Sequence, residues 1–139
     1  MPRKRSYRTR HLSRREVREL DIKISFLEGI LRRDSEFVEA LQLIGDCYTA
    51  RGCYRDSVRV DQTLARLEPH DPLVFYNLAC SYSLNRQFTP AAVALEQALT
   101  LGYRDFKWLV KDPDLRGLRR HPAYQDVAER LRKMKVRPI

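Results

Sequence analysis

The side chains with the most reactive chemistry in this 139-residue sequence are three cysteines and three histidines, so their spacing decides whether they can share a metal ion. Cys47 and Cys53 lie six residues apart, without the second close pair that a zinc site requires, and Cys80 stands alone. The histidines are scattered, at His11, His70 and His121. An odd number of cysteines in a chain of this size also argues against a disulfide framework. We therefore expect three reduced thiols and no metal site.

Two other groupings could support catalysis, and both have a simpler explanation. Asp112 and Asp114 form the closest carboxylate pair, but they flank Pro113 in a pattern typical of a helix-capping turn. Cys80 and Asn77 share one predicted helix, but no histidine is expected near them to act as a base. The sequence also has no glycine-rich phosphate loop. It therefore predicts a protein that is not an enzyme and that holds no cofactor.

An internal repeat organises the middle of the chain. Residues 38–71 align with residues 72–105 so that large side chains match large ones and small match small. The matched pairs are Leu41 with Phe75, Ile44 with Leu78, Gly45 with Ala79, Tyr48 with Tyr82, Tyr54 with Phe88, Ser57 with Ala91, and Leu67 with Leu101. The first four positions are spaced by three, one and three residues, which places them on one face of a helix. We expect two helix–turn–helix units, and we call the offset between them the repeat interval.

Residues suited to helix ends stand at the boundaries of these predicted helices. Asp71 is expected to cap a helix whose first residue is Pro72, and Thr89 with Pro90 is expected to repeat that arrangement one helix later. Glycine adopts the left-handed conformation without steric cost, so two glycines are expected to end helices: Gly52 and Gly102.

The pattern resembles the tetratricopeptide repeat family, whose unit is a helix–turn–helix of about 34 residues. In the first unit the signature positions hold Leu41, Ile44, Gly45, Tyr48, Ser57 and Pro69. In the second unit they hold Phe75, Leu78, Ala79, Tyr82, Ala91, Leu95 and Ala98. Three positions depart from the family: Asp61 replaces an aromatic residue, Leu64 an alanine and Tyr103 a proline. The resemblance implies an all-α fold in which antiparallel helix pairs form a right-handed superhelix.

Two units need apolar cover at both ends, and the flanking segments are expected to supply it. We expect a basic, disordered tail at residues 1–12 and a capping half-repeat helix at 13–35, followed by units 38–71 and 72–105. The repeat fails beyond residue 105, where residues 106–139 resemble the helical cap of small bacterial repeat proteins. The apolar residues expected to bury in this cap are Trp108, Leu115, Leu118, Tyr124, Val127 and Leu131.

The net charge of +9 is concentrated at the two ends of the chain. Residues 1–18 hold eight Lys/Arg and one acid, and residues 104–139 hold eleven Lys/Arg and five acids. Residues 36–103 hold five Lys/Arg and eight acids, so the middle is mildly acidic. Clustered Arg and Lys attract phosphate, and they also occur as solvated tails.

The resemblance implies a binding role, because stacked helix pairs present a concave surface that can hold a peptide or partner helix. The family's groove positions correspond to Glu39, Gln42, Leu43, Asp46, Thr49, Leu73, Tyr76, Asn77, Cys80 and Ser83. Asn77 occupies a position at which the family uses Asn to bond a ligand backbone, and Tyr76 is expected to offer a flat interface surface. Gln42 and Asp46 replace the residues of a carboxylate clamp, so a basic or mixed peptide is the better match.

The main prediction is therefore a scaffold that binds a protein or peptide. The alternative is a module recruited to RNA, ribosomes or acidic surfaces through its basic ends. Self-association through an exposed edge helix is a third possibility, as a weak homodimer. No apolar run is long enough to cross a bilayer and no apolar segment follows the basic start, so the expected compartment is the cytoplasm.

Overall fold

The computed structural model describes residues 11–136, and over this range the chain is built from helices and turns without strands. Residues 1–10 and 137–139 lie outside the described range, and with them most of the tail predicted at 1–12. The helices are α1 (Arg14–Arg33), α2 (Val38–Arg51), α3 (Tyr54–Leu67), α4 (Pro72–Leu84), α5 (Phe88–Leu101), α6 (Phe106–Leu109), α7 (Arg116–Arg119) and α8 (Gln125–Val136), with 3-10 turns η1 (Pro113–Leu115) and η2 (Pro122–Tyr124). The predicted all-α class is confirmed.

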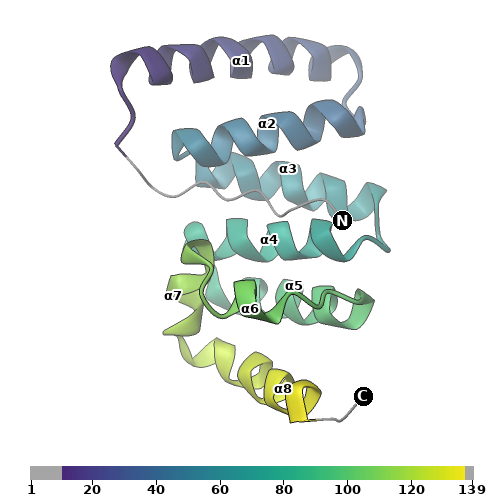
Figure 1. The fold of residues 1–139 in the computed structure, drawn as a ribbon. Coiled ribbons are helices and arrows are strands. Elements are labelled where there is room, and N and C mark those ends of the chain that lie inside the picture. The colour runs from purple at the N-terminus through teal and green to yellow at the C-terminus, as the bar shows by residue number, and fades with distance from the viewer. Residues whose placement is uncertain (1–10, 137–139) are drawn as a thin grey trace.

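The long helices pack in adjacent pairs along the chain (Figure 1). α2 packs on α3, α4 packs on α5, and α3 joins the two pairs by packing on α4. α1 covers α2 at one end of the stack. At the other end, η1, α7, η2 and α8 pack against α4 and α5. Each interior helix therefore buries one face against the helix before it and another against the helix after it.

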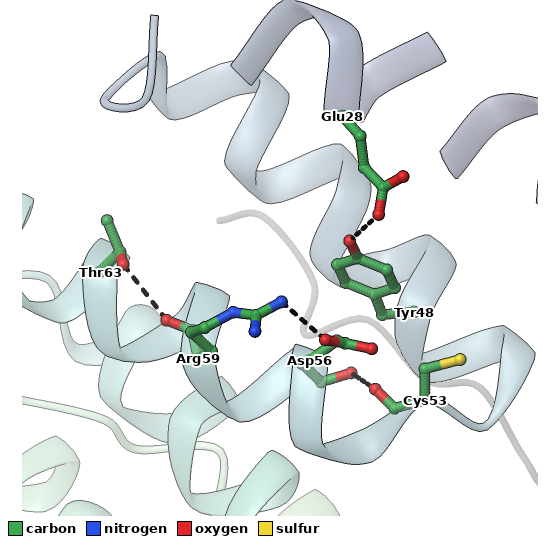
Figure 2. Close-up of polar contacts among 7 residues, drawn as sticks. Glu28, Tyr48, Cys53, Asp56, Arg59 and Thr63 are labelled. Carbon is green, nitrogen blue, oxygen red and sulfur yellow. Dashed lines mark hydrogen bonds and ion pairs between the residues drawn. The ribbon is translucent and has the colours of Figure 1, made fainter. Parts of the chain in front are cut away.

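Side-chain contacts recur at the repeat interval that the sequence predicts. The Tyr48 hydroxyl donates a 2.7 Å hydrogen bond to Glu28 of α1, as Figure 2 shows. One interval later, Gln62 of α3 donates a 2.8 Å bond to the Tyr82 hydroxyl. In both cases a tyrosine on the first helix of a pair is tied to the helix that precedes the pair. The two units therefore share an equivalent hydrogen bond as well as a similar pattern of large and small side chains.

Most of the predicted helix ends are confirmed. Asp71 accepts a 2.9 Å bond from the Leu73 amide and caps α4, with Pro72 as the first residue. Gly52 ends α2 at φ +86°, and Gly102 ends α5 at φ +115°. Arg86 follows α4 at φ +60° and lies one repeat interval after Gly52. Both repeats therefore turn through the left-handed region, although only the first supplies a glycine.

The start predicted for α5 is wrong. α5 begins at Phe88 after Gln87, so Thr89 is already helical and does not cap. Pro90 is the third helical residue, where the first-turn amides have no intrahelical acceptor. The missing proline N–H therefore costs the helix nothing, and the Thr-Pro pair shifts two residues into it.

The apolar core forms two adjoining clusters. The first joins α1, α2 and α3 around Leu27, Leu41 and Ile44. The second joins α4, α5 and the C-terminal segment, whose buried residues are Leu109, Leu115, Leu118, Val127 and Leu131. Trp108 and Tyr124 pack against this cluster while partly exposed. Of the six cap residues predicted to be buried, four are buried, which are Leu115, Leu118, Val127 and Leu131. Trp108 and Tyr124 are only partly buried.

The face of α1 turned away from α2 carries two exposed apolar side chains, Ile22 (63% exposed) and Phe26 (68% exposed). α1 is otherwise amphipathic and begins with a complete capping box between Ser13 and Glu16. None of the described helices has the length and apolar character needed to cross a membrane.

Candidate functional site

The candidate site is the face formed by α2, α4 and the turn Asp112–Asp114, which we name the inner face. Figure 1 shows α2, α4 and α6 one below another on the near side of the stack, with α3 and α5 behind them. Positions on this face recur at the repeat interval: Asp46, Cys80 and Asp114 form one row, and Leu43, Asn77 and Lys111 form another. The inner face thus continues past the second unit into the C-terminal segment.

The ten groove residues predicted from the sequence divide into an accessible and a buried group. Glu39, Gln42 and Leu43 are exposed, and Leu43 leaves 56% of its surface accessible. Partly exposed are Asp46, Leu73 and Asn77. The other four are buried: Thr49, Tyr76, Cys80 and Ser83. Only the first six can contact a ligand without rearrangement of the fold.

Tyr76 is fully buried, so the prediction that it offers an exposed interface surface is wrong. Its ring stacks on Tyr103, with centroids 4.1 Å apart and planes at 7°. Its hydroxyl donates a 2.8 Å bond to Asp112 Oδ2. Burial, with the negative charge of Asp112 nearby, raises the pKa of the Tyr76 hydroxyl far above its ordinary value. Tyr76 is therefore a buried donor to a carboxylate.

The other buried candidates hold helices together. The Thr49 hydroxyl donates to the Gly45 carbonyl (2.9 Å) and lies 3.0 Å from the Ser57 hydroxyl of α3. The Ser83 hydroxyl accepts a 3.3 Å bond from the Leu118 amide of α7. These contacts link α2 to α3 and α4 to the cap. We assign Thr49 and Ser83 a structural role.

Asp112 and Asp114 lie in a buried turn at the end of the inner face, 0% and 5% exposed. Asp112 Oδ1 accepts a 3.0 Å bond from the Asp114 amide, and Pro113 is the first residue of η1. The predicted capping role of this turn is confirmed. Because Asp112 also receives the Tyr76 hydroxyl and the Cys80 thiol (3.8 Å), the cap is also tied to the inner face.

Asp61 is a further buried carboxylate, 1% exposed, on α3. Its Oδ2 accepts a 2.5 Å bond from the Ser81 hydroxyl of α4. This is the position at which the sequence departs from the aromatic residue of the repeat pattern. The substitution places a carboxylate between the two helix pairs.

Acidic side chains therefore gather from three segments of the chain around the inner face. The accessible ones are on α2, and the buried ones are on α3 and in the turn 112–114: Glu39, Asp46, Asp61, Asp112 and Asp114. The exposed Lys111 is the cation at the end of the row formed by Leu43 and Asn77. Charges near a low-dielectric interior interact more strongly than charges in open water. Of these carboxylates only those of Glu39 and Asp46 have surface accessible to a ligand.

Asn77 contributes an acceptor to the same face. Its Oδ1 atom is buried and makes no hydrogen bond within the described part of the chain, although the residue as a whole is partly exposed. Buried polar atoms of this kind are nearly always hydrogen-bonded. A donor brought by a ligand, such as a backbone N–H, would satisfy it.

Sequence reasoning missed three of these residues. Asp61 stands out in the sequence only as a departure from the repeat, and Asp112 and Asp114 only as caps. The missed signal is the interval itself, since Asp114 lies one repeat interval beyond Cys80 and two beyond Asp46. Pro113 interrupts the helical pattern, so the repeat is hard to recognise in this part of the sequence. Asp114 nevertheless lies at the position that the repeat interval predicts.

Two hollows lie outside the inner face at matching positions of the repeats. One, of about 490 Å³, is lined by residues that include Leu41, Ile44 and Tyr48. The other, of about 550 Å³, is lined by the residues one repeat interval later, Phe75, Leu78 and Tyr82, and is mainly apolar. Neither is lined by a histidine or a cysteine. They are secondary candidates for apolar contact.

Comparison with known proteins gives a partial match. The chain is similar to a chloroplastic protein of Arabidopsis thaliana, with 33% identity over 92 residues. The match covers 64% of this chain and 26% of that protein, so the chain spans about a quarter of the length of this relative. No family model matches the sequence. No solved structure matches it either.

Proposed function

We propose that this protein is a non-enzymatic scaffold of the tetratricopeptide repeat type, and that its inner face binds a basic, extended segment of a protein partner. The observation that carries the proposal is the exposed Glu39, Gln42 and Leu43 of α2 beside the partly exposed Asn77 of α4, whose Oδ1 atom is a buried acceptor without a hydrogen bond among the described residues. A single ligand with cationic side chains and backbone donors would match both features.

The recurrence of structure at the repeat interval supports the repeat type. Helices pack in pairs, the tyrosines of both pairs bond the preceding helix, and both first helices end in left-handed turns. Such repeats present their first helices on one continuous surface. Here those helices are α2 and α4.

The chemistry of the inner face favours a basic ligand over an acidic one. Like-charge contact with an acidic ligand costs free energy, whereas Arg or Lys side chains would be attracted to the accessible carboxylates of Glu39 and Asp46. Leu43, 56% exposed, adds an apolar contact beside them. Affinity would come from several such contacts along an extended segment.

The test is a fluorescence anisotropy titration of the full-length protein with a labelled decapeptide of alternating Arg and Ser. A decapeptide of alternating Glu and Ser and a single-stranded RNA of the same length serve as comparisons. Asp46→Asn should weaken binding of the basic peptide about three- to fivefold, because it removes one partly exposed charge contact. Glu129→Gln, which removes an exposed carboxylate from α8, is the matched control and should have no effect.

The proposal fails if the basic peptide does not bind, or if Asp46→Asn and Glu129→Gln have equal effects. RNA binding that is lost at raised salt and is insensitive to Asp46→Asn would instead favour recruitment through the basic ends.

A further inference from the structure

We propose that the face of α1 turned away from α2 is a homodimer contact, at which two copies of this chain pair their α1 helices antiparallel about a two-fold axis. We call it the end face. It is separate from the inner face, so the inference goes beyond the proposed function. Such a dimer would carry two inner faces, which strengthens binding to a partner with repeated segments.

The two ends of the helix stack differ in how they are covered (Figure 1). At one end η1, α7, η2 and α8 pack against α4 and α5. At the other end α1 packs on α2, and its opposite face leaves Ile22 63% and Phe26 68% exposed. Since only one end of the described stack has an open apolar face, head-to-tail addition of copies has no matching surface. Two end faces can meet each other, and that pairing closes at a dimer.

The apolar residues of the end face match a second copy of themselves. Ile22 and Phe26 are about one helical turn apart, so a two-fold axis beside residue 24 places each Phe26 against Ile22 of the second copy. Gly29 is on the same face, about two turns after Ile22. Within the described chain a Cβ atom at Gly29 would meet only Arg32 Nη2, at 3.6 Å, so no packing inside the chain requires a glycine there. Between two copies, this glycine allows a close approach of the helices.

Charged residues on either side of the apolar pair are complementary about the same axis. Arg15 Nε lies 3.2 Å from Glu19 Oε1, which draws the Glu19 carboxylate toward the level of residue 15. The axis beside residue 24 brings Arg33 of the second copy to that level. Each Glu19 would then lie between Arg15 of its own helix and Arg33 of the other. Apolar side chains meet apolar ones and an acid meets a base, which is the match that a second copy supplies.

The size of the contact sets its strength. α1 has 20 residues and is about 30 Å long, so two copies share a strip about 30 Å by 10 Å. Each copy contributes about 300 Å², compared with about 800 Å² per partner in a stable interface. We expect a weak dimer with a Kd on the order of 100 µM, which is monomeric at low micromolar concentration.

The experiment is sedimentation equilibrium of the full-length protein over about 5–500 µM, a range that brackets the expected Kd. Ile22→Ser and Phe26→Ser should each weaken the dimer at least about tenfold, because each removes an apolar contact from both copies. Both side chains are exposed, so far-UV circular dichroism of the variants should be unchanged. Val93→Ser is the matched control: it removes a 64% exposed apolar side chain from α5 and should leave the Kd unchanged.

A charge exchange tests the antiparallel pairing itself. Glu19→Arg and Arg33→Glu should each weaken the dimer about three- to fivefold, because each places like charges opposite one another. The two substitutions in one chain restore an acid opposite a base and should return the Kd close to that of the wild type. A double variant as weak as the single ones would refute the pairing.

Three other results would overturn the inference. A wild type that stays monomeric to about 500 µM assigns the end face to a different partner. Equal effects of Phe26→Ser and Val93→Ser place the contact elsewhere. A dimer that Phe26→Ser leaves intact and raised salt dissociates would assign association to the basic ends. The Arg-Ser decapeptide titration uses monomeric protein at low micromolar concentration, so its outcome and that of the dimer experiment are independent.

Discussion

The left-handed turns that follow α2 and α4 allow one prediction to be worked out in detail. Gly52 and Arg86 occupy equivalent positions, at φ +86° and φ +60°. A Cβ atom at Gly52 would meet nothing within 4 Å, so the cost of Gly52→Ala comes from the backbone alone. The left-handed conformation costs a non-glycine residue about 1–2 kcal/mol, of which the reduced entropy of the unfolded chain returns about 0.4–1 kcal/mol.

We therefore expect Gly52→Ala to lower the free energy of unfolding by about 1 kcal/mol. Arg86→Gly removes the cost of the left-handed conformation and increases the entropy of the unfolded chain. It should therefore raise the free energy of unfolding by up to about 1 kcal/mol. For a chain of this length, about 1 kcal/mol corresponds to a change in Tm of about 3–5 °C. Urea unfolding followed by far-UV circular dichroism measures both variants.

Gly29→Ala is the matched control, because Gly29 lies inside α1 and an added Cβ would meet only Arg32 Nη2, at an ordinary 3.6 Å. It should stabilise the protein by about 0.5–1 kcal/mol, since alanine is the better helix former. The reasoning is refuted if Gly52→Ala stabilises as Gly29→Ala does, or if Arg86→Gly destabilises.

Three shorter predictions concern two buried groups and one close contact between helices. Burial raises the pKa of Tyr76 above its ordinary 10.0, so the folded chain keeps a proton that the unfolded chain releases: stability is complete below pH 10 and falls above it. Above pH 10 the free energy of unfolding of the wild type should therefore fall with pH more steeply than that of Tyr76→Phe, by about 1.4 kcal/mol per pH unit. Equal slopes for the two proteins would contradict the burial of this hydroxyl. Cys80 is 2% exposed whereas Cys47 and Cys53 are partly exposed, so a thiol reagent should modify two cysteines in the native protein and the third only after denaturation; three equal rates would contradict the burial. A Cβ at Gly117 would lie 2.9 Å from a ring carbon of α5, so Gly117→Ala should lower Tm by several degrees, and an unchanged Tm would contradict the close packing.

The sequence was sufficient to predict what depends on local pattern. The spacing of Leu41, Ile44 and Tyr48 follows from helix geometry, so the helix and its buried face could be predicted from one segment. The same holds for the end of α2, since Gly52 has a conformation that few other residues adopt. These inferences need no knowledge of what packs against the segment.

Burial that depends on distant segments could not be predicted in this way. Tyr76 occupies a groove position within its own repeat, but Tyr103 and Asp112 cover it from distant parts of the chain. Asp61 looks like a surface residue in sequence and becomes a buried acceptor only because Ser81 faces it. The buried carboxylates Asp61 and Asp112 were therefore missed for the same reason: each is placed by a partner on another element, far away in the sequence.

The most direct test of the central claim, that the inner face binds basic segments, is an NMR titration of the full-length protein with the Arg-Ser decapeptide. We predict amide shift changes confined to α2, α4 and the turn 112–114, with Asn77 among the largest. Changes confined to α8 and the outer surfaces of α3 and α5 would contradict the account.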